Sequence, residues 1–126
     1  MIAETLKAIL VVGSGSFVGG AARYLISLAM KNVSKGFPWA TRLVNVSGCL
    51  LIGLLWGWLS RTSQMDGNLA LFLTVGLCGG FTTFSTFSKE AFVLMQGGNI
   101  WGFAGYVLAS VVFGIAFVAL GYLIAK

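Results

Sequence analysis

The stretch that decides the fold is Gly79-Gly80-Phe81-Thr82-Thr83-Phe84-Ser85-Thr86-Phe87-Ser88. It places two glycines and five hydroxyl residues inside a long apolar run. Glycine is the weakest helix former after proline, and Ser and Thr compete with the helix for its backbone hydrogen bonds. The stretch therefore predicts a helix that is interrupted part-way along its length. The alternative is a regular helix in which the hydroxyls bond back to their own turn.

The interrupted helix is the third of four apolar segments. A bilayer core requires about 20 apolar residues per helix, and the chain supplies this length at about residues 8–30, 39–60, 69–96 and 100–125. The break falls near the bilayer midplane, where irregular backbone is stable only if it is buried in protein or lines a cavity. Carbonyls freed by such a break are typical ligands for Na⁺. The sequence predicts a single-domain, all-α membrane protein of four transmembrane helices, the third of them broken.

The composition excludes most other classes of protein. Of the 126 residues, 58% are apolar and 9% are charged, whereas a soluble domain carries about 25% charged residues. Lipid is therefore the expected surrounding. The net charge of +5 is scattered along the chain rather than gathered into the basic stripe that nucleic acid requires. The chain has no His, and its acidic residues are Glu4, Asp66 and Glu90. We expect neither an enzyme nor a nucleic-acid-binding protein.

The distribution of basic residues leaves the orientation undecided. Four spans place both termini on one side of the membrane. The basic residues expected on that side are Lys7, Arg61 and Lys126. Those expected on the other side are Lys31, Lys35, Arg42 and Lys89, with Arg23 as a fifth if its side chain extends to that surface. A difference this small does not fix the orientation, which normally follows the Lys/Arg bias. We expect insertion in both orientations, and therefore an antiparallel dimer of identical chains. Glycines four residues apart, such as Gly15 and Gly19, also favour close helix association.

Phe84 and Phe87 are three residues apart, so they share one helical face beyond the break. The hydroxyls of Ser85 and Thr86 lie between them in the sequence. An aromatic ring has a negative face and a positive edge. Ring edges can attract a small anion while binding it weakly enough to let it leave, as conduction requires. Packing or lipid contact is the alternative for these two rings.

Four further residues could contribute polar groups inside the membrane. Asn45 lies deep in the second span, and its amide offers two donors to an anion or an interhelical hydrogen bond. Tyr106 and Ser110, at i and i+4, add donors on one face of the last span, although Tyr106 could instead be an interfacial anchor. Arg23 either extends to the membrane surface or forms a vestibule cation that draws anions inward.

Three motifs resemble the Fluc (CrcB) family of fluoride channels. They are Gly-Gly-Ala-Ala-Arg-Tyr ending at Tyr24, Thr-Arg-Leu-Val-Asn ending at Asn45, and Gly-Gly-Phe-Thr-Thr-Phe-Ser-Thr-Phe ending at Phe87. The third is highly specific, and the resemblance extends over essentially the whole chain. It implies an antiparallel, dual-topology homodimer in the bacterial inner membrane, with two pores that export fluoride passively from the cytoplasm. It also implies a Na⁺ ion at the dimer centre, held by main-chain carbonyls of the two third-helix breaks.

The resemblance also implies roles for individual residues. The positions that match the family's fluoride pore are Asn45, Phe84, Ser85, Thr86, Phe87, Tyr106 and Ser110. Gly79 and Thr82 match the positions whose carbonyls bind Na⁺. The chain departs from the family at Ala40 and Arg42, which stand where a glycine and an apolar residue are usual. A charge in the Thr41–Asn45 motif could alter the geometry of the vestibule or the conductance.

Two other functions are compatible with four apolar helices. A small dual-topology, proton-coupled transporter requires a carboxylate deep in the first helix, but Glu4 precedes the first span and the next acid is Asp66. A non-transporting structural subunit has no need of five hydroxyls and a backbone break at its centre. Selectivity for fluoride over chloride is implied by the resemblance alone.

Overall fold

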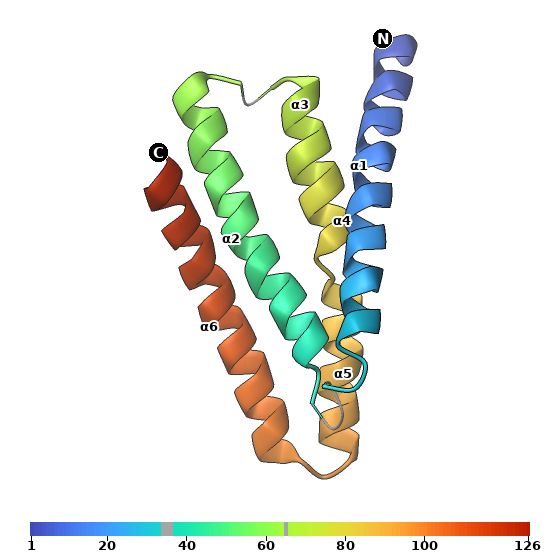
Figure 1. The fold of residues 1–126 in the computed structure, drawn as a ribbon, viewed down its shortest axis with the longest axis vertical. Coiled ribbons are helices and arrows are strands. Elements are labelled where there is room, and N and C mark those ends of the chain that lie inside the picture. Colours follow the sequence, from blue (N-terminus) through green and yellow to red (C-terminus); the bar gives the residue numbers. More distant parts are fainter. Residues whose placement is uncertain (34–36, 65) are drawn as a thin grey trace.

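The computed structural model describes residues 1–33, 37–64 and 66–126, and it consists of helices and short connections (Figure 1). The four long apolar segments are α1 (Ile2–Ala29), α2 (Trp39–Thr62), a composite third segment (Asn68–Gln96) and α6 (Ile100–Ala125). Each is long and apolar enough to cross a bilayer. The prediction of a four-helix membrane protein is confirmed. Lys35, which entered the charge count above, lies outside the described residues.

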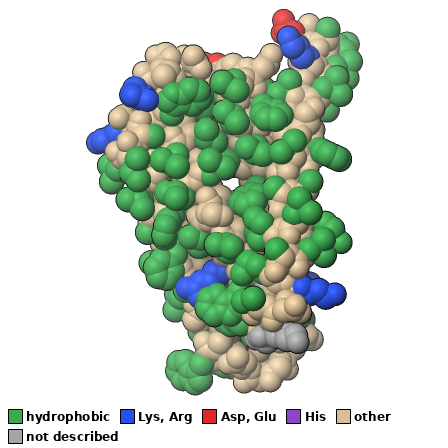
Figure 2. Space-filling view, in the orientation of Figure 1, with side chains coloured by type: hydrophobic (Ala, Val, Ile, Leu, Met, Phe, Trp, Pro, Cys, Tyr) green, Lys and Arg blue, Asp and Glu red, His purple; other side chains and the backbone are tan. Residues whose placement is uncertain are grey.

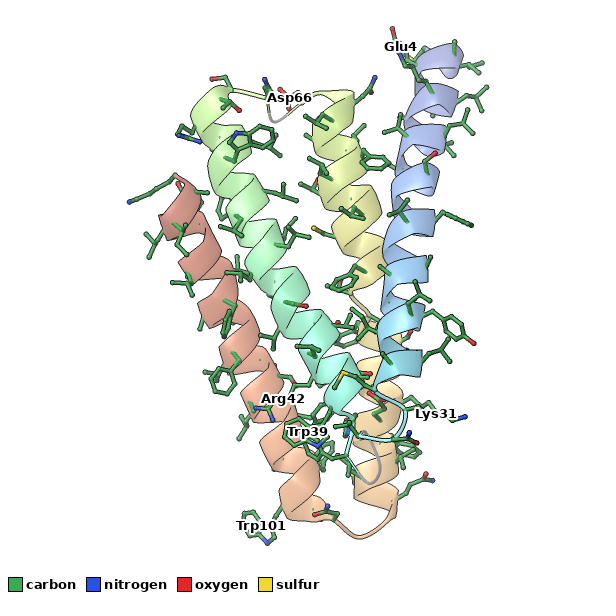
Figure 3. All side chains as sticks on the ribbon, viewed as in Figure 1. Glu4, Lys31, Trp39, Arg42, Asp66 and Trp101 are labelled. Carbon is green, nitrogen blue, oxygen red and sulfur yellow. The ribbon has the colours of Figure 1, made fainter. Side chains whose placement is uncertain are left out.

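The two ends of the molecule and its apolar sides match a membrane-spanning orientation. Both termini and the connection after α2 lie at one end, and the other two connections lie at the opposite end (Figure 1). Glu4 and Asp66 mark the first end, and Lys31 and Arg42 lie near the other (Figure 3). Hydrophobic side chains cover much of the face between them (Figure 2). The core is thin, and its largest fully buried side chains are Tyr106, Leu59 and Val44. The apolar surface therefore fits lipid and not water.

The helix ends follow from local sequence. Pro38 immediately precedes α2, and Ser63 ends it in the left-handed conformation at φ 59°. Between the third segment and α6, Gly98 adopts φ +80°, which glycine accommodates without strain. The Asn99 side chain then caps α6 by accepting the Gly102 N–H at 2.8 Å. This tight turn makes the last two helical segments antiparallel neighbours.

The third segment is composite and bent. It begins with α3 (Asn68–Ala70), continues as the π-helix η1 (Leu71–Cys78) and α4 (Gly79–Phe81), and resumes as α5 (Phe84–Gln96). Between α4 and α5, Thr82 (ψ 160°) and Thr83 (φ −149°) are extended. The predicted interruption is present, and it falls near the middle of the segment.

The helices pack as two pairs, α1 with η1 and α4, and α2 with α6. Glycine permits the close approach in both pairs. A Cβ atom at Gly19 would collide with the Leu77 carbonyl oxygen, and one at Gly53 would collide with the Val118 carbonyl oxygen. Helix pairs in lipid gain stability from this kind of backbone contact. The two pairs hold the break of the third segment between α1 and α2.

Candidate functional site

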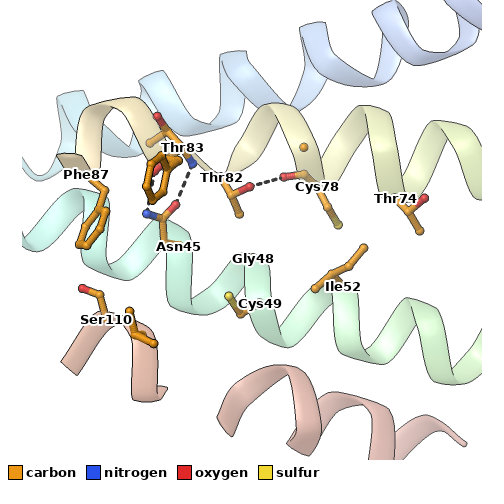
Figure 4. A pocket seen from close by; sticks show the side chains of 13 residues that line it. Asn45, Gly48, Cys49, Ile52, Thr74, Cys78, Thr82, Thr83, Phe87 and Ser110 are labelled. Atoms are coloured by element: carbon orange, nitrogen blue, oxygen red, sulfur yellow. Dashed lines mark hydrogen bonds between the residues drawn. The ribbon is translucent and has the colours of Figure 1, made fainter. Parts of the chain in front are cut away.

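A cavity of about 450 Å³ opens beside the break (Figure 4). The third segment, α2 and α6 all contribute to its wall. Its lining combines apolar side chains with hydroxyl, thiol and amide groups. The lining residues are Asn45, Gly48, Cys49, Ile52, Thr74, Cys78, Gly79, Thr82, Thr83, Phe84, Phe87, Ser110 and Val111. The structure thus brings six of the residues singled out from the sequence to one cavity: Asn45, Gly79, Thr82, Phe84, Phe87 and Ser110.

Asn45 binds the backbone of the break (Figure 4). Its Nδ2 donates to the Thr83 carbonyl oxygen at 3.0 Å, and its Oδ1 accepts the Thr83 N–H at 2.8 Å. One side-chain amide on α2 therefore satisfies both main-chain polar groups of an unwound residue, which would otherwise be costly in a membrane interior. This bond uses one N–H of the amide, and the second N–H has no partner among the described residues. The sequence suggested two donors for an anion or an interhelical bond, and the structure has the interhelical bond.

The hydroxyls of the break cap the two half-helices. The Thr83 Oγ1 accepts the Thr86 N–H at 3.2 Å, which caps the start of α5. The Thr82 Oγ1 donates to the Cys78 carbonyl at 2.9 Å. Because the N–H groups of Thr83 and Thr86 bond to side chains, the carbonyls of Gly79 and Thr82 lose their usual helical donors. Both of these residues line the cavity.

These two freed carbonyls fit a monovalent cation better than a transition metal. Carbonyl oxygens of unwound helices are typical Na⁺ ligands. Within the described part of the chain, His, Cys, Asp and Glu form no group of three that could hold a metal ion. A cation bound here would therefore be held by main chain, and two carbonyls leave room for ligands from elsewhere.

Aromatic rings form a row that starts at the cavity. Phe84 and Phe87 lie 5.9 Å apart between ring centroids and are tilted by 48°. Phe87 is also 5.0 Å from Tyr106 on α6. Phe84 is 78% exposed in the single chain, whereas Tyr106 is 1% exposed. Phe84 thus lies on the surface of the chain, and Phe87 contacts both it and the buried Tyr106 ring of α6.

The Tyr106 hydroxyl donates to the Glu90 Oε1 at 3.2 Å. In this arrangement the hydroxyl proton of Tyr106 points to a carboxylate and not to the cavity. Glu90 is a half-buried acid within the third segment, and an acid inside a span marks a functional position by default. The sequence offered this signal, but its partner on α6 could only be found in three dimensions.

Arg23 contacts the other side of the break. Its Nε donates to the Gly80 carbonyl at 3.2 Å. A cation at the C-terminal end of a half-helix is favourable because it complements the helix dipole. Arg23 is half-buried on α1 and therefore helps to fix the end of α4. The sequence offered either a surface-reaching or a vestibule side chain, and the bond to Gly80 was not foreseen.

The remaining predicted pore residues lie at different depths. Ser110 lines the cavity from α6. Ser85 is exposed, and its Oγ lies 3.5 Å from the Thr83 Oγ1. Thr86 is half-buried, and its N–H is used to cap α5. Thr83, which bonds to Asn45 and Thr86, is the central residue of the break and was not singled out from the sequence.

Sequence similarity to known proteins assigns the chain to a family. The family model for "CrcB-like protein, Camphor Resistance (CrcB)" matches residues 10–122 of the chain. The chain belongs to the CrcB family. A CrcB relative from Prosthecochloris aestuarii is 43% identical over 123 residues, which cover 98% of this chain and 96% of the relative. A relative from Methylobacterium nodulans is 49% identical over 107 residues, or 85% of this chain and 86% of the relative.

Both of these CrcB relatives carry the name "Fluoride-specific ion channel FluC". A third relative with this name, from Methylobacterium sp. strain 4-46, is 45% identical, and the match covers 93% of this chain and 94% of the relative. CrcB is thus a family of channels rather than of enzymes. The four apolar helices and this membership identify the chain as a multi-pass membrane protein. The family resemblance inferred from the three sequence motifs is confirmed.

Proposed function

We propose that this protein is a fluoride-selective channel through which fluoride leaves the cytoplasm passively. The observation that carries the proposal is the cavity at the break, lined by Asn45, Phe84, Phe87 and Ser110, in a chain whose relatives are named for fluoride conduction. We further propose that it works as an antiparallel homodimer with two pores, inserted in both orientations in a bacterial inner membrane.

The cavity side chains provide weak, separate contacts for a small anion. Asn45 has one amide N–H left after bonding to Thr83, and Ser110 offers a hydroxyl. The positive edges of Phe84 and Phe87 add attraction without a formal charge. An anion that passes from one weak site to the next is held firmly enough to lose its water and loosely enough to move on.

A second copy of the chain would complete the site. Phe84 is largely exposed on a single subunit, although its neighbour Phe87 reaches the buried ring of Tyr106. A partner crossing at the break would cover Phe84 and bring two more carbonyls to those of Gly79 and Thr82. We propose that a Na⁺ ion at this crossing is bound by these main-chain oxygens and links the two breaks.

Fluoride efflux from liposomes tests the proposal directly. Purified protein is reconstituted in vesicles loaded with potassium fluoride, and valinomycin is added so that K⁺ can follow. We expect rapid release of fluoride to an external electrode, and no comparable release of chloride from matched vesicles loaded with potassium chloride. Equal release of the two halides, or fluoride release no faster than from protein-free vesicles, would overturn the proposal.

A further inference from the structure

Arg42 is a charged residue held by aromatic rings at one end of the molecule. It lies in the first turn of α2, and its side chain is half-buried. Its guanidinium carbon is 5.5 Å from the centroid of the Trp39 ring and 5.7 Å from that of Phe113 (Figure 3 labels Arg42 and Trp39). Guanidinium groups at this distance are attracted to ring faces. These contacts therefore fix the guanidinium between α2 and α6 and limit the motion of its side chain.

The position of Phe113 relates Arg42 to the cavity. On α6, Phe113 lies three residues after Ser110 and seven after Tyr106, so all three share one helical face. Ser110 lines the cavity, and Tyr106 contacts Phe87, which also lines it. Arg42 thus lies against the face of α6 that carries the polar group of the cavity wall.

A continuous row of rings leads from the cavity to Arg42. Beyond Phe87 and Tyr106, the row passes to Phe37 at 5.6 Å and from Phe37 to Trp39 at 4.8 Å between centroids. Trp39 then contacts the Arg42 guanidinium. The one carboxylate described beside this row, Glu90, accepts a hydrogen bond from Tyr106.

We propose that Arg42 is an anion-recruiting residue, which concentrates fluoride at this end of the conduction path. This inference rests on the proposed function. A fixed positive charge near the mouth of a low-dielectric passage raises the local concentration of anions and their rate of arrival. It need not contact the ion in the cavity. Because Arg42 would act through its field, its contribution must weaken as salt screens that field.

The alternative is that Arg42 only anchors α2 at the membrane surface, as arginine at helix ends often does. The two roles differ in salt dependence. The Debye length falls from about 30 Å at 0.01 M salt to about 3 Å at 1 M. Removal of a recruiting charge lowers flux chiefly at low salt, whereas loss of an anchor lowers flux equally at both.

The experiment compares fluoride efflux at these two ionic strengths, set on both sides of the vesicles with an impermeant organic-anion salt. The vesicles contain only zwitterionic phosphatidylcholine and phosphatidylethanolamine, so that lipid charge does not contribute. We expect Arg42→Leu to lower flux roughly threefold to tenfold at low salt, and less than about twofold at high salt. Arg42→Lys retains the charge and should keep most of the salt dependence of the unaltered protein.

Lys31→Gln is the matched control, because it removes one exposed positive charge from the same end. It should change flux by less than about twofold at either ionic strength. Size exclusion establishes that each variant is intact, and Arg42→Gln replaces Arg42→Leu if the latter aggregates. A neutral variant whose loss is the same at both salt concentrations would overturn the role of Arg42. Absence of fluoride flux in the unaltered protein would instead overturn the proposed function, and this inference with it.

Discussion

The bond between Asn45 and the broken helix gives the sharpest structural prediction. Asn45→Ala removes both hydrogen bonds to Thr83, at 3.0 and 2.8 Å, and leaves the N–H and carbonyl of an unwound residue without that partner. A net hydrogen bond contributes about 1 kcal/mol in water-soluble proteins, and about 0.6 kcal/mol on average between membrane helices. For two bonds, we expect Asn45→Ala to lower the free energy of unfolding by about 1–2 kcal/mol.

The assay is equilibrium unfolding in mixed micelles, followed by the fluorescence of the four tryptophans. Ser47→Ala is the matched control on the same helix. Within the described residues, the Ser47 hydroxyl donates to carbonyls of its own helix, at 2.7 Å for Leu43. Its effect should stay within about 0.5 kcal/mol. If Asn45→Ala is no more destabilising than Ser47→Ala, the amide does not hold the break, and the reasoning from backbone satisfaction is refuted.

Three further predictions concern the pore, the packing and the cation. Phe84→Ile and Phe87→Ile keep apolar bulk but lose the ring edge, and each should reduce fluoride flux at least about tenfold, or 1.4 kcal/mol at the barrier. Phe92→Ile, on the exposed face of α5, should not reduce fluoride flux. Equal flux in all three variants would show that the rings of Phe84 and Phe87 do not contribute to conduction. Gly19→Ala forces a Cβ against the Leu77 carbonyl and should destabilise the fold by about 1–3 kcal/mol. Gly13→Ala is the control, because its Cβ would meet open space. Similar melting temperatures of the two variants would contradict the packing. Replacing Na⁺ by N-methylglucamine during reconstitution and efflux should reduce flux, which added Na⁺ should restore. Undiminished flux without Na⁺ would contradict a Na⁺ ion at the carbonyl site.

Local sequence was sufficient to predict the helices and the break. Apolar length alone identified four spans, since a bilayer imposes one length on every helix that crosses it. The break between Gly79 and Phe84 was also predictable, because glycine and hydroxyl residues act on the backbone within a turn or two. The start of α1 was less clear. The helix begins at Ile2 and includes Glu4 and Lys7, so helix formation continues past the apolar run that revealed it.

The partners of polar groups could not be predicted, because they depend on how distant segments pack. Asn45 was expected to face an anion or another helix, and only the structure pairs it with Thr83, 38 residues away. The bond from Arg23 to Gly80 spans 57 residues, and nothing near Arg23 in the sequence indicates it. Tyr106 was expected either to add a donor on a face shared with Ser110 or to be an interfacial anchor, and only the structure shows that its hydroxyl donates to Glu90 on a neighbouring helix. The predicted roles of the pore residues stay predictions. The structure defines their positions, and four of them line one cavity: Asn45, Phe84, Phe87 and Ser110.

The most direct test of the central claim is the reversal potential of the purified protein in a planar bilayer. With a tenfold gradient of fluoride and symmetric chloride and pH, a passive fluoride-selective channel gives a current that reverses at about 59 mV in magnitude, the equilibrium potential of a monovalent ion. Imposing a tenfold chloride gradient instead should leave the reversal near zero. A reversal that follows the chloride or proton gradient, or fluoride transport without current, would contradict the account.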